Sequence, residues 1–221
     1  MKLDSMSSNN SKSKILDAAV ALISKREGAD VSMGEIATEA GVSRQAMYLH
    51  FAHRGDLMLA LVRHVDEKRG LAEALRKVHE APSGLDTLSE LVALQARMNP
   101  DLWAIARTFD AVRRTDPAVE QAWKDRLNNR LKGARRIVAR LHHEGSLKPG
   151  LTAKAAADIL WSITSLRTWE DFVLQRGWSA VEYQQRVTRL VHDALIQPDL
   201  SSPGHKPRDS RRKSPAIASS R

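Results

Sequence analysis

Apolar side chains recur at helical spacing from Ser13 to Ile196, and no sustained run of alternating β-branched residues interrupts them. This pattern predicts an all-α protein. In the first third of the chain, the predicted elements are a helix over about Ser13–Arg26, two short helices around Ile36–Ala40 and Met47–Phe51, and a longer helix from Leu57 to about Val78.

A break at Pro82-Ser83-Gly84 separates these elements from a second helical section. The breaks within that section have local causes, which are Pro100, the Thr115-Asp116-Pro117 turn, the loop from Gly145 to Gly150, and Gly177. The helices expected between these breaks are Leu85–Asn99, Asp101–Arg114, Pro117–His143, Thr152–Arg176 and Ala180–Ile196.

The stretch from Val31 to Phe51 carries the signals of two short helices joined by a tight turn. Ser32 is a good N-cap residue, and Glu35 stands at the capping-box position that follows it. Gly41 can take the left-handed conformation that ends the first helix, and Ser43 can cap the second. The sequence therefore predicts a helix, a short turn and a second helix, with Met47 facing the core.

Such a geometry presents the outer face of the second helix to a DNA major groove. Gln45 can hydrogen-bond to adenine, Arg44 can reach a guanine or a phosphate, and Ala46 can touch a thymine methyl group. The side chains expected to contact phosphates are Ser32, Ser43, Tyr48, His50 and, at the start of the next helix, Arg54. Taken singly, each of these would also suit the solvated face of an ordinary helical hairpin, and the full pattern is more specific than any one of them.

The pattern Ile36-Ala37-x-x-Ala40-Gly41-Val42-Ser43, followed by Met47-Tyr48-x-His50-Phe51 and then Asp56-Leu57, resembles a known family. It is similar to the DNA-binding domain of the TetR family of bacterial transcriptional regulators, over about residues 12 to 65. Further along, Leu160–Ser165 and Gln175–Ser179 are also similar to the last two helices of many members.

The resemblance implies a homodimer that binds a palindromic double-stranded operator, usually represses transcription, and releases DNA when a small-molecule effector enters the C-terminal domain. The positions that face DNA in the family correspond here to Ser32, Ser43, Arg44, Gln45, Ala46, Tyr48, His50 and Arg54. This sequence departs from the family pattern in two places. Gly34 stands where a longer side chain is common, and His53-Arg54-Gly55 replaces a frequent Ser-Lys-Glu.

The expected organisation is a disordered N-terminus over 1–12, a helix-turn-helix domain over 13–80, an effector-binding and dimerisation domain over 81–198, and a disordered basic tail over 199–221. Of the formal net charge of +9, this last segment contributes +4, from 6 basic and 2 acidic residues. A tail of this kind can solubilise the chain or contact nucleic acid without sequence preference.

Four of the five Trp residues lie inside predicted helices of the second section. Large aromatic side chains can line an apolar ligand pocket between helices, and they are also a common way to fill a core. Arg107 and Thr164 are candidate groups for orienting a ligand, although a partly exposed helix face explains either. The candidate effector pocket is Trp103, Arg107, Trp123, Trp161, Thr164 and Trp169, and its ligand is not identified by the sequence.

Apolar stripes on the last two predicted helices could be internal core or a dimer interface. The family builds its dimer as a four-helix bundle from two such helices per subunit, and two recognition helices can engage half-sites about 34–36 Å apart. The candidate interface residues are Ile163, Leu166, Val187, Leu190, Val191 and Ala194.

Composition excludes several classes of protein. The chain has 221 residues and no Cys, which excludes a disulfide scaffold, a thiolate metal site and a cysteine nucleophile. Its longest apolar runs are far shorter than the ~20 residues of a membrane span, and the polar start lacks the apolar centre of a secretory signal. We therefore expect a cytoplasmic protein without a membrane partner.

The sequence leaves other functional interpretations open. A metal site could use His50, His53 and Asp56, which span a predicted turn where His50 already has a phosphate-facing role. It could also use His142, His143 and Glu144, although adjacent His residues do not share one helix face. No catalytic constellation or cofactor motif can be identified. An architectural or co-regulatory DNA-binding protein without an effector is the main alternative. The basic run from Lys124 to Arg140 suits a solvated helix face better than a second nucleic-acid surface.

Overall fold

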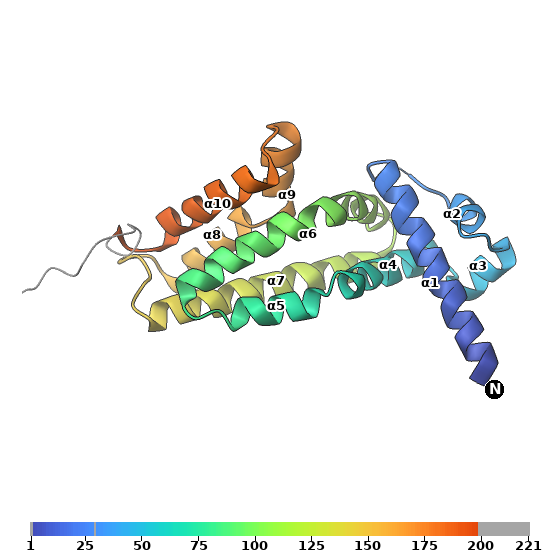
Figure 1. The fold of residues 1–221 in the computed structure, drawn as a ribbon, viewed down its shortest axis with the longest axis horizontal. Helices are drawn as coiled ribbons and strands as arrows, with labels where there is room; N and C mark the ends of the chain where they lie inside the picture. The colour runs from blue at the N-terminus through green and yellow to red at the C-terminus, as the bar shows by residue number, and fades with distance from the viewer. Residues whose placement is uncertain (1, 29, 199–221) are drawn as a thin grey trace, which may run out of the picture.

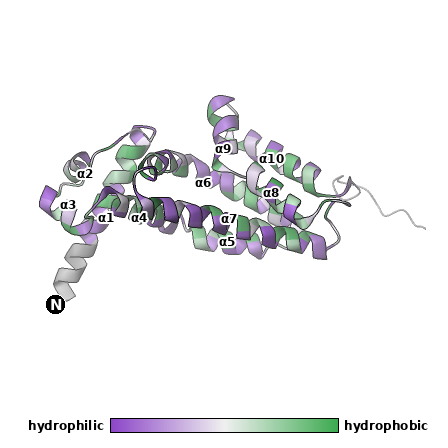
Figure 2. Ribbon diagram, turned by 180° about the vertical axis from the view of Figure 1, so that it is seen from behind, coloured by the Kyte–Doolittle hydropathy of each residue, from purple (hydrophilic) through white to green (hydrophobic). Residues whose placement is uncertain are grey.

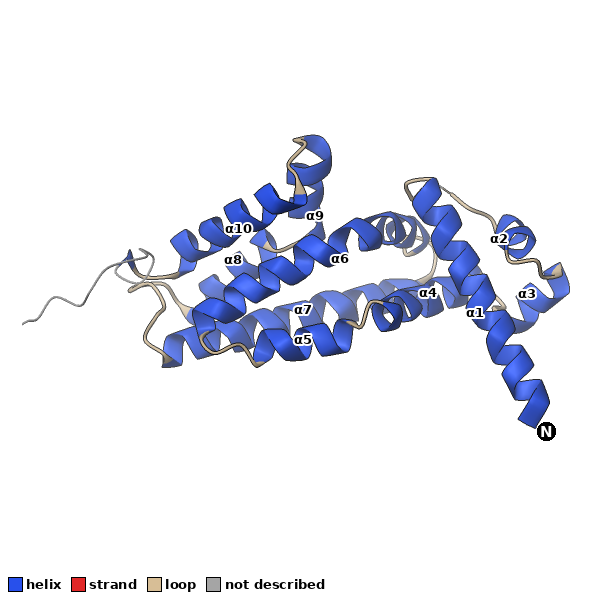
Figure 3. Ribbon diagram, in the orientation of Figure 1, coloured by secondary structure: helices blue, strands red, loops and turns tan. Residues whose placement is uncertain are grey.

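The computed structural model describes residues 2–28 and 30–198, so the expected basic tail over 199–221 lies outside the described residues. Over these ranges the chain is helical and has no strand, which confirms the all-α prediction (Figure 3). The elements are α1 Lys2–Lys25, α2 Met33–Glu39, α3 Arg44–His50, α4 Arg54–Lys68, α5 Leu71–His79, α6 Gly84–Val112, α7 Pro117–His143, α8 Ala153–Ile163, α9 Leu166–Trp169, the π-helix Glu170–Gln175 and α10 Ala180–Leu195.

The molecule is elongated, with α1, α2 and α3 at one end (Figure 1). The long helices α6 and α7 lie along the long axis and pack against each other, while α8 packs on α7 and α10 packs on both α6 and α8. Hydrophobic and hydrophilic residues alternate along these helices (Figure 2). That alternation gives each helix an apolar face to bury against its neighbours.

The buried side chains form two large clusters. The first core joins α1 to α4 and is centred on residues such as Ile15, Met47 and Leu61. The second core lies between α6, α7, α8 and α10 and includes Leu88, Leu141, Leu160, Val187 and Val191.

The first core does not stop at the expected domain boundary near residue 80. Ile105 and Phe109 of α6 and Val119 of α7 are buried in it together with the residues of α1, α3 and α4. The far ends of the two long helices are therefore part of the packing that holds the helix-turn-helix.

Helix boundaries differ from the sequence prediction in the first third of the chain. Helix α1 begins at Lys2, whereas a disordered segment was expected over 1–12. The buried stripe beginning at Ile15 provides the packing that nucleates this helix, and adding residues to an existing helix is far easier than starting one. The helix predicted from Leu57 to Val78 is interrupted by Gly70, whose φ of +62° separates α4 from α5.

Two further boundaries differ in the second section. Helix α6 continues through Pro100, although a break was expected there, because apolar residues on both sides of it are buried and tertiary packing outweighs the lost backbone hydrogen bond. The helix predicted over Thr152–Arg176 is broken at Thr164 and Ser165. Ser165 caps the next helix by accepting a hydrogen bond from the Thr168 N–H at 3.1 Å.

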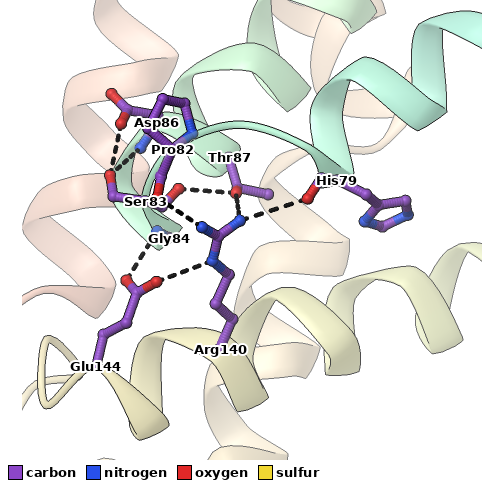
Figure 4. A network of polar contacts seen from close by, with 8 residues as sticks. All are labelled: His79, Pro82, Ser83, Gly84, Asp86, Thr87, Arg140 and Glu144. Atoms are coloured by element: carbon purple, nitrogen blue, oxygen red, sulfur yellow. Dashed lines mark hydrogen bonds and ion pairs between the residues drawn. The ribbon is translucent and has the colours of Figure 1, made fainter.

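A polar clasp ties the start of α6 to the end of α7 (Figure 4). The Arg140 guanidinium donates to the Pro82 carbonyl at 2.8 Å, to the Thr87 hydroxyl at 3.1 Å and to Glu144 Oε1 at 2.8 Å. Glu144 Oε2 in turn accepts the Gly84 N–H at 2.8 Å, and this hydrogen bond is the main cause of the lowered pKa of Glu144. These contacts hold α6 antiparallel to α7. They thereby set which side chains of the two helices lie level with one another along the helix axes.

Candidate nucleic-acid interface

Local signals in the sequence place α2 and α3 as predicted. The Ser32 hydroxyl accepts the Glu35 N–H at 3.2 Å, and Glu35 Oε2 accepts the Ser32 N–H at 2.9 Å, which completes the capping box. Gly41 has a φ of +65° and turns the chain, after which Ser43 caps α3 by accepting the Ala46 N–H at 3.1 Å. These contacts confirm the predicted helix–turn–helix geometry.

The carboxylate of Glu35 is strongly stabilised in its charged form. The hydrogen bond from the Ser32 backbone, then that from the Ser32 hydroxyl, and then that from Arg26 lower the pKa of Glu35 from 4.5 to about 2. Arg26 of α1 donates to Glu35 Oε1 at 2.7 Å. The same carboxylate thus caps α2 and ties it to the end of α1.

Helix α3 buries one side and exposes the other. Met47 is 1% exposed in the first core, as predicted, whereas Arg44, Gln45 and Tyr48 are exposed. Ala46 and His50 are half-buried at the edges of this face. The exposed face therefore carries the predicted base-reading side chains, and the buried face holds the helix on the first core.

A hollow of about 350 Å³ opens between the start of α2 and α3. Its walls include four of the predicted DNA-contacting residues, which are Ser32, Arg44, Tyr48 and Arg54. Gly34 also lines it, and a Cβ atom at this position would stand 3.2 Å from Arg44 Nη2. The missing side chain at Gly34 therefore leaves room for the Arg44 guanidinium beside α2.

Arg54 is not free in this arrangement. Its guanidinium forms an ion pair with Asp30 in the connection between α1 and α2, and its buried Nε has no hydrogen-bond partner among the described residues. Asp30 itself is 83% exposed. The exposed carboxylate of Asp30 thus occupies one side of the Arg54 guanidinium, which was predicted to contact a phosphate.

Three residues of this surface were missed by the sequence interpretation. Leu49 is 80% exposed beside Tyr48, at a position that the family pattern leaves unspecified. Lys12 places its Nζ 5.8 Å from the Phe51 ring centroid, at the end of α3, and was assigned to a disordered segment. The sequence does not indicate a role for Asp30, because an acidic residue in a loop is common.

The second section contacts the start of α4 directly. A Cβ atom at Gly55 would meet the Asp116 side chain, with Cγ at 2.8 Å, and Val119 Cγ2 at 3.1 Å. Asp116 caps α7 by accepting the Ala118 N–H at 2.9 Å. Gly55, which departs from the family pattern, therefore allows the first turn of α7 to pack against the first turn of α4.

Two ion pairs extend this connection along α4. Arg126 of α7 donates to both carboxylate oxygens of Asp66, at 2.7 and 3.1 Å. Arg69, just after α4, pairs with Asp101 of α6 at 2.7 Å. Helix α4, which follows the recognition helix, is thus fixed to both long helices of the second section.

The predicted effector residues do not form one cluster. Trp123 packs against Phe109 beside the first core, with the two rings tilted at 33°, and Arg107 is exposed and donates to the Glu27 carbonyl at 3.3 Å. Trp103 contacts both cores. Trp161 and Trp169 belong to the second core, and the carbonyls of Trp161 and Thr164 both accept from Arg130.

The predicted dimer residues divide into two groups. Val187 and Val191 are fully buried in the second core of their own chain, so neither offers surface to a second copy. Ile163, Leu166 and Ala194 are half-buried, and Leu190 is 43% exposed. Val181, 63% exposed on α10, was not predicted.

No three His, Asp or Glu side chains within 2–28 and 30–198 stand close enough to hold a metal ion. None of the helices in these ranges has the combined length and apolar character of a membrane span.

Comparison with known proteins agrees with this geometry. Residues 15–61 match the family described as "Bacterial regulatory proteins, tetR family". An HTH-type transcriptional regulator of Mycobacterium tuberculosis (strain CDC 1551 / Oshkosh) is 34% identical over 100 residues, which are 45% of this chain and 49% of the relative. The chain thus spans about half the length of the first relatives that it matches.

Two other similarities extend over most of the chain. The nucleoid occlusion factor SlmA of Marinobacter nauticus is 26% identical over 188 residues, which are 83% of this chain and 85% of the relative. A transcriptional regulator from Saccharomonospora viridis, solved in complex with choline, has a TM-score of 0.73 at 18% identity and covers 85% of this chain and 98% of its own. At that identity, the structural likeness shows a shared fold.

Proposed function

We propose that the chain is a transcriptional regulator of the TetR family, which binds a palindromic operator as a homodimer and leaves it when a small molecule enters the second core. The observation that carries this proposal is the exposed face of α3. Arg44, Gln45 and Tyr48 stand together there, while Met47 on the opposite face is buried. A short helix of this composition suits the major groove.

A homodimer suits a protein that recognises DNA through one short helix per chain. One short helix makes few base contacts, whereas two copies related by a twofold axis read a palindrome and add their binding energies. Leu190 and Val181 on α10 remain exposed in the single chain. We place the interface on the outer faces of α8 and α10, which differs from the sequence prediction at the internal residues Val187 and Val191.

Release by a ligand would act through α4. This helix follows the recognition helix and contacts α7 at Gly55 and Asp66 and α6 through Arg69. A ligand that separates α6 from α7 would move α4 with them and change the spacing of the two recognition helices. The choline-bound relative supports a ligand site in this fold, without identifying the ligand of this chain.

The test is selection of bound sequences from a random DNA pool by the purified chain, at about 0.15 M salt so that simple phosphate attraction is partly screened. We expect an enriched inverted repeat. Binding that enriches no sequence and fades smoothly with salt would contradict a sequence-specific regulator.

A second candidate function is an architectural DNA-binding protein that has no effector. It is favoured by the relative that matches over most of its own length, which is named a nucleoid occlusion factor. The two candidates differ in their response to small molecules. A regulator with an effector loses operator binding in the presence of some ligand, whereas the second candidate retains it.

A further inference from the structure

A layer of polar side chains crosses the apolar second core at half its height. On α6, the face that buries Leu88 and Val92 continues with Gln95, Asn99 and Trp103, which follow one another at four-residue spacing. Gln95 Oε1, Asn99 Nδ2 and Trp103 Nε1 are each buried, and none has a hydrogen-bond partner among the described residues. Such groups cost free energy unless something binds them.

Because α6 and α7 pack antiparallel, a cationic side chain of α7 lies level with these polar side chains along the helix axes. Contacts join Gly84 to Glu144 at one end of this pair and Arg113 to Glu120 at the other. Midway between these contacts, Arg130 of α7 stands level with Asn99 to within about one helical turn.

Arg130 has no carboxylate partner among the described ion pairs. Its Nη2 donates to the Thr164 carbonyl at 2.9 Å and to the Trp161 carbonyl at 3.1 Å, both at the end of α8, and its guanidinium lies 5.4 Å from the Trp161 ring centroid. Burial lowers the pKa of Arg130. A cation compensated only by carbonyls and a ring favours an anion beside it.

Helix α10 adds a hydroxyl to the layer. Tyr183 is fully buried, and its OH group has no partner among the described residues. His192 contacts the backbone of Leu85 near the start of α6, and counting back along α10 from this contact brings Tyr183 to the height of Gln95. Burial raises the pKa of Tyr183 to about 12, and the charge of Arg130 opposes this rise.

The helices around this layer are interrupted at the same height. Pro100 follows Asn99 and has no N–H to offer to the Ala96 carbonyl. Helix α8 ends at Ile163, and the π-helix Glu170–Gln175 follows soon afterwards. Interruptions of this kind are frequent at functional sites and let helices separate locally.

We propose that this polar layer binds the carboxylate of an organic acid whose apolar body lies among the Trp residues of the second core. Arg130, Asn99, Trp103 and Tyr183 are all able to donate hydrogen bonds, and a carboxylate accepts several of them at once. Gln95 Oε1 is an unpartnered atom of the layer that can only accept a hydrogen bond, and it suits a ligand hydroxyl or amide. This inference rests on the effector role proposed for the second core.

The first test measures binding to the full purified chain without DNA. Butanoate, octanoate, dodecanoate and phenylacetate are each compared with the primary amide of the same skeleton, by tryptophan fluorescence and by calorimetry. We expect at least one acid to bind saturably and about tenfold more tightly than its amide, since hydrogen bonds to charged groups are stronger. Absence of saturable binding by all four acids, or equal binding of acid and amide, overturns the proposal.

Two variants test the residues themselves. Asn99→Asp preserves the shape of the side chain but places a negative charge in the layer, so acid binding is expected to fall at least about tenfold and to fall more than amide binding does. Arg130→Met is expected to bring acid affinity down to that of the amide. Arg136→Met, on the exposed face of the same helix, is the matched control and keeps wild-type binding. Wild-type acid binding by Asn99→Asp overturns the proposal, and thermal unfolding checks that each variant is folded.

The affinity of the chain for its operator is measured in a separate experiment. If an acid binds but operator affinity is unchanged, the carboxylate site stands and the release mechanism proposed above fails. If an operator is selected and no acid binds, the carboxylate site fails and the DNA-binding function stands.

Discussion

Gln45 is the side chain whose loss should affect sequence preference most clearly. It is exposed near the start of α3. Replacing Gln45 by Ala should therefore weaken discrimination at one base pair of each half-site by about 1–3 kcal/mol, because a bidentate contact to adenine is lost. Affinities for the selected operator and for single-base variants of it would measure this.

The matched change is Tyr48→Phe, which removes one hydroxyl from the same helix. Tyr48 is expected to contact a phosphate, so this change should weaken all DNA sequences by a similar factor. Equal losses on operator and random DNA for Gln45→Ala would assign Gln45 to the phosphates as well.

Asp30 is expected to oppose DNA binding. Its carboxylate is paired with Arg54 and is largely exposed next to the predicted phosphate path. An exposed ion pair contributes only about 0–1 kcal/mol to stability, so Asp30→Asn should leave the fold unchanged. Removing the charge should raise DNA affinity about two- to fivefold, more at low salt, because it frees Arg54 and reduces repulsion of phosphates.

Fluorescence anisotropy at two salt concentrations would measure this effect. Asp158→Asn is a suitable control, since Asp158 is an exposed carboxylate paired with Lys154 on α8, away from α3. An unchanged affinity in Asp30→Asn would mean that Arg54 does not contact DNA.

At the scale of elements, the contact between α4 and α7 depends on Gly55. An Ala at this position would displace Asp116 and with it the cap of α7, so Gly55→Ala should lower the free energy of unfolding by about 1–3 kcal/mol. Gly133→Ala is the control. Gly133 lies inside α7 with no atom near its missing Cβ, so this change should raise stability by about 0.5–1 kcal/mol. Denaturant unfolding of both variants measures the two signs, and a stabilised Gly55→Ala would contradict the close packing.

Helix α2 should be sensitive to acid through Glu35. The pKa of Glu35 in the folded chain is about 2, below its ordinary 4.5, so the charged form favours the folded state. Its contribution is complete above about pH 4.5 and is lost as the pH falls toward about 2. Backbone NMR signals of α2 would follow this loss. In Glu35→Gln the contribution should not change over that window, and identical behaviour of the two proteins would show that Glu35 does not cap the helix.

Elements with strong local signals could be predicted from the sequence, and the others could not. The caps at Ser32 and Ser43 and the turn at Gly41 depend on neighbouring residues alone. In contrast, α6 passes through Pro100 because residues from distant helices bury both of its halves. A propensity rule contains no information about such packing, so the expected break was wrong.

At the scale of the whole molecule, the DNA-reading end is not expected to fold alone. Residues 1–80 lack Ile105, Phe109 and Val119, which fill the first core. Expressed as a fragment, this segment should show no cooperative thermal unfolding by circular dichroism, whereas the full chain should unfold cooperatively. Cooperative unfolding of the fragment would show that α1 to α5 have a sufficient core of their own.

The location of the Trp residues shows why the second section was hard to predict. Trp103, Trp123 and Trp161 all lie on helices as expected, but each packs in a different place. The packing of α6 and α7 against α4 decides which core each Trp joins. Local sequence patterns do not predict this packing. The polar layer was missed for a related reason, since Asn99 and Arg130 reach the same level only once α6 and α7 pack antiparallel.

The extension of the first core into α6 and α7 has a practical consequence for protein engineers. Biosensors are often assembled by transplanting the DNA-reading head of one regulator onto the sensing bundle of another. A chimera joined near residue 81 would separate Ile105 and Phe109 from their partners on α1 and α4 and leave gaps in the first core. A successful graft of this chain would have to exchange α6 and α7 together with the head, or redesign both sides of that seam.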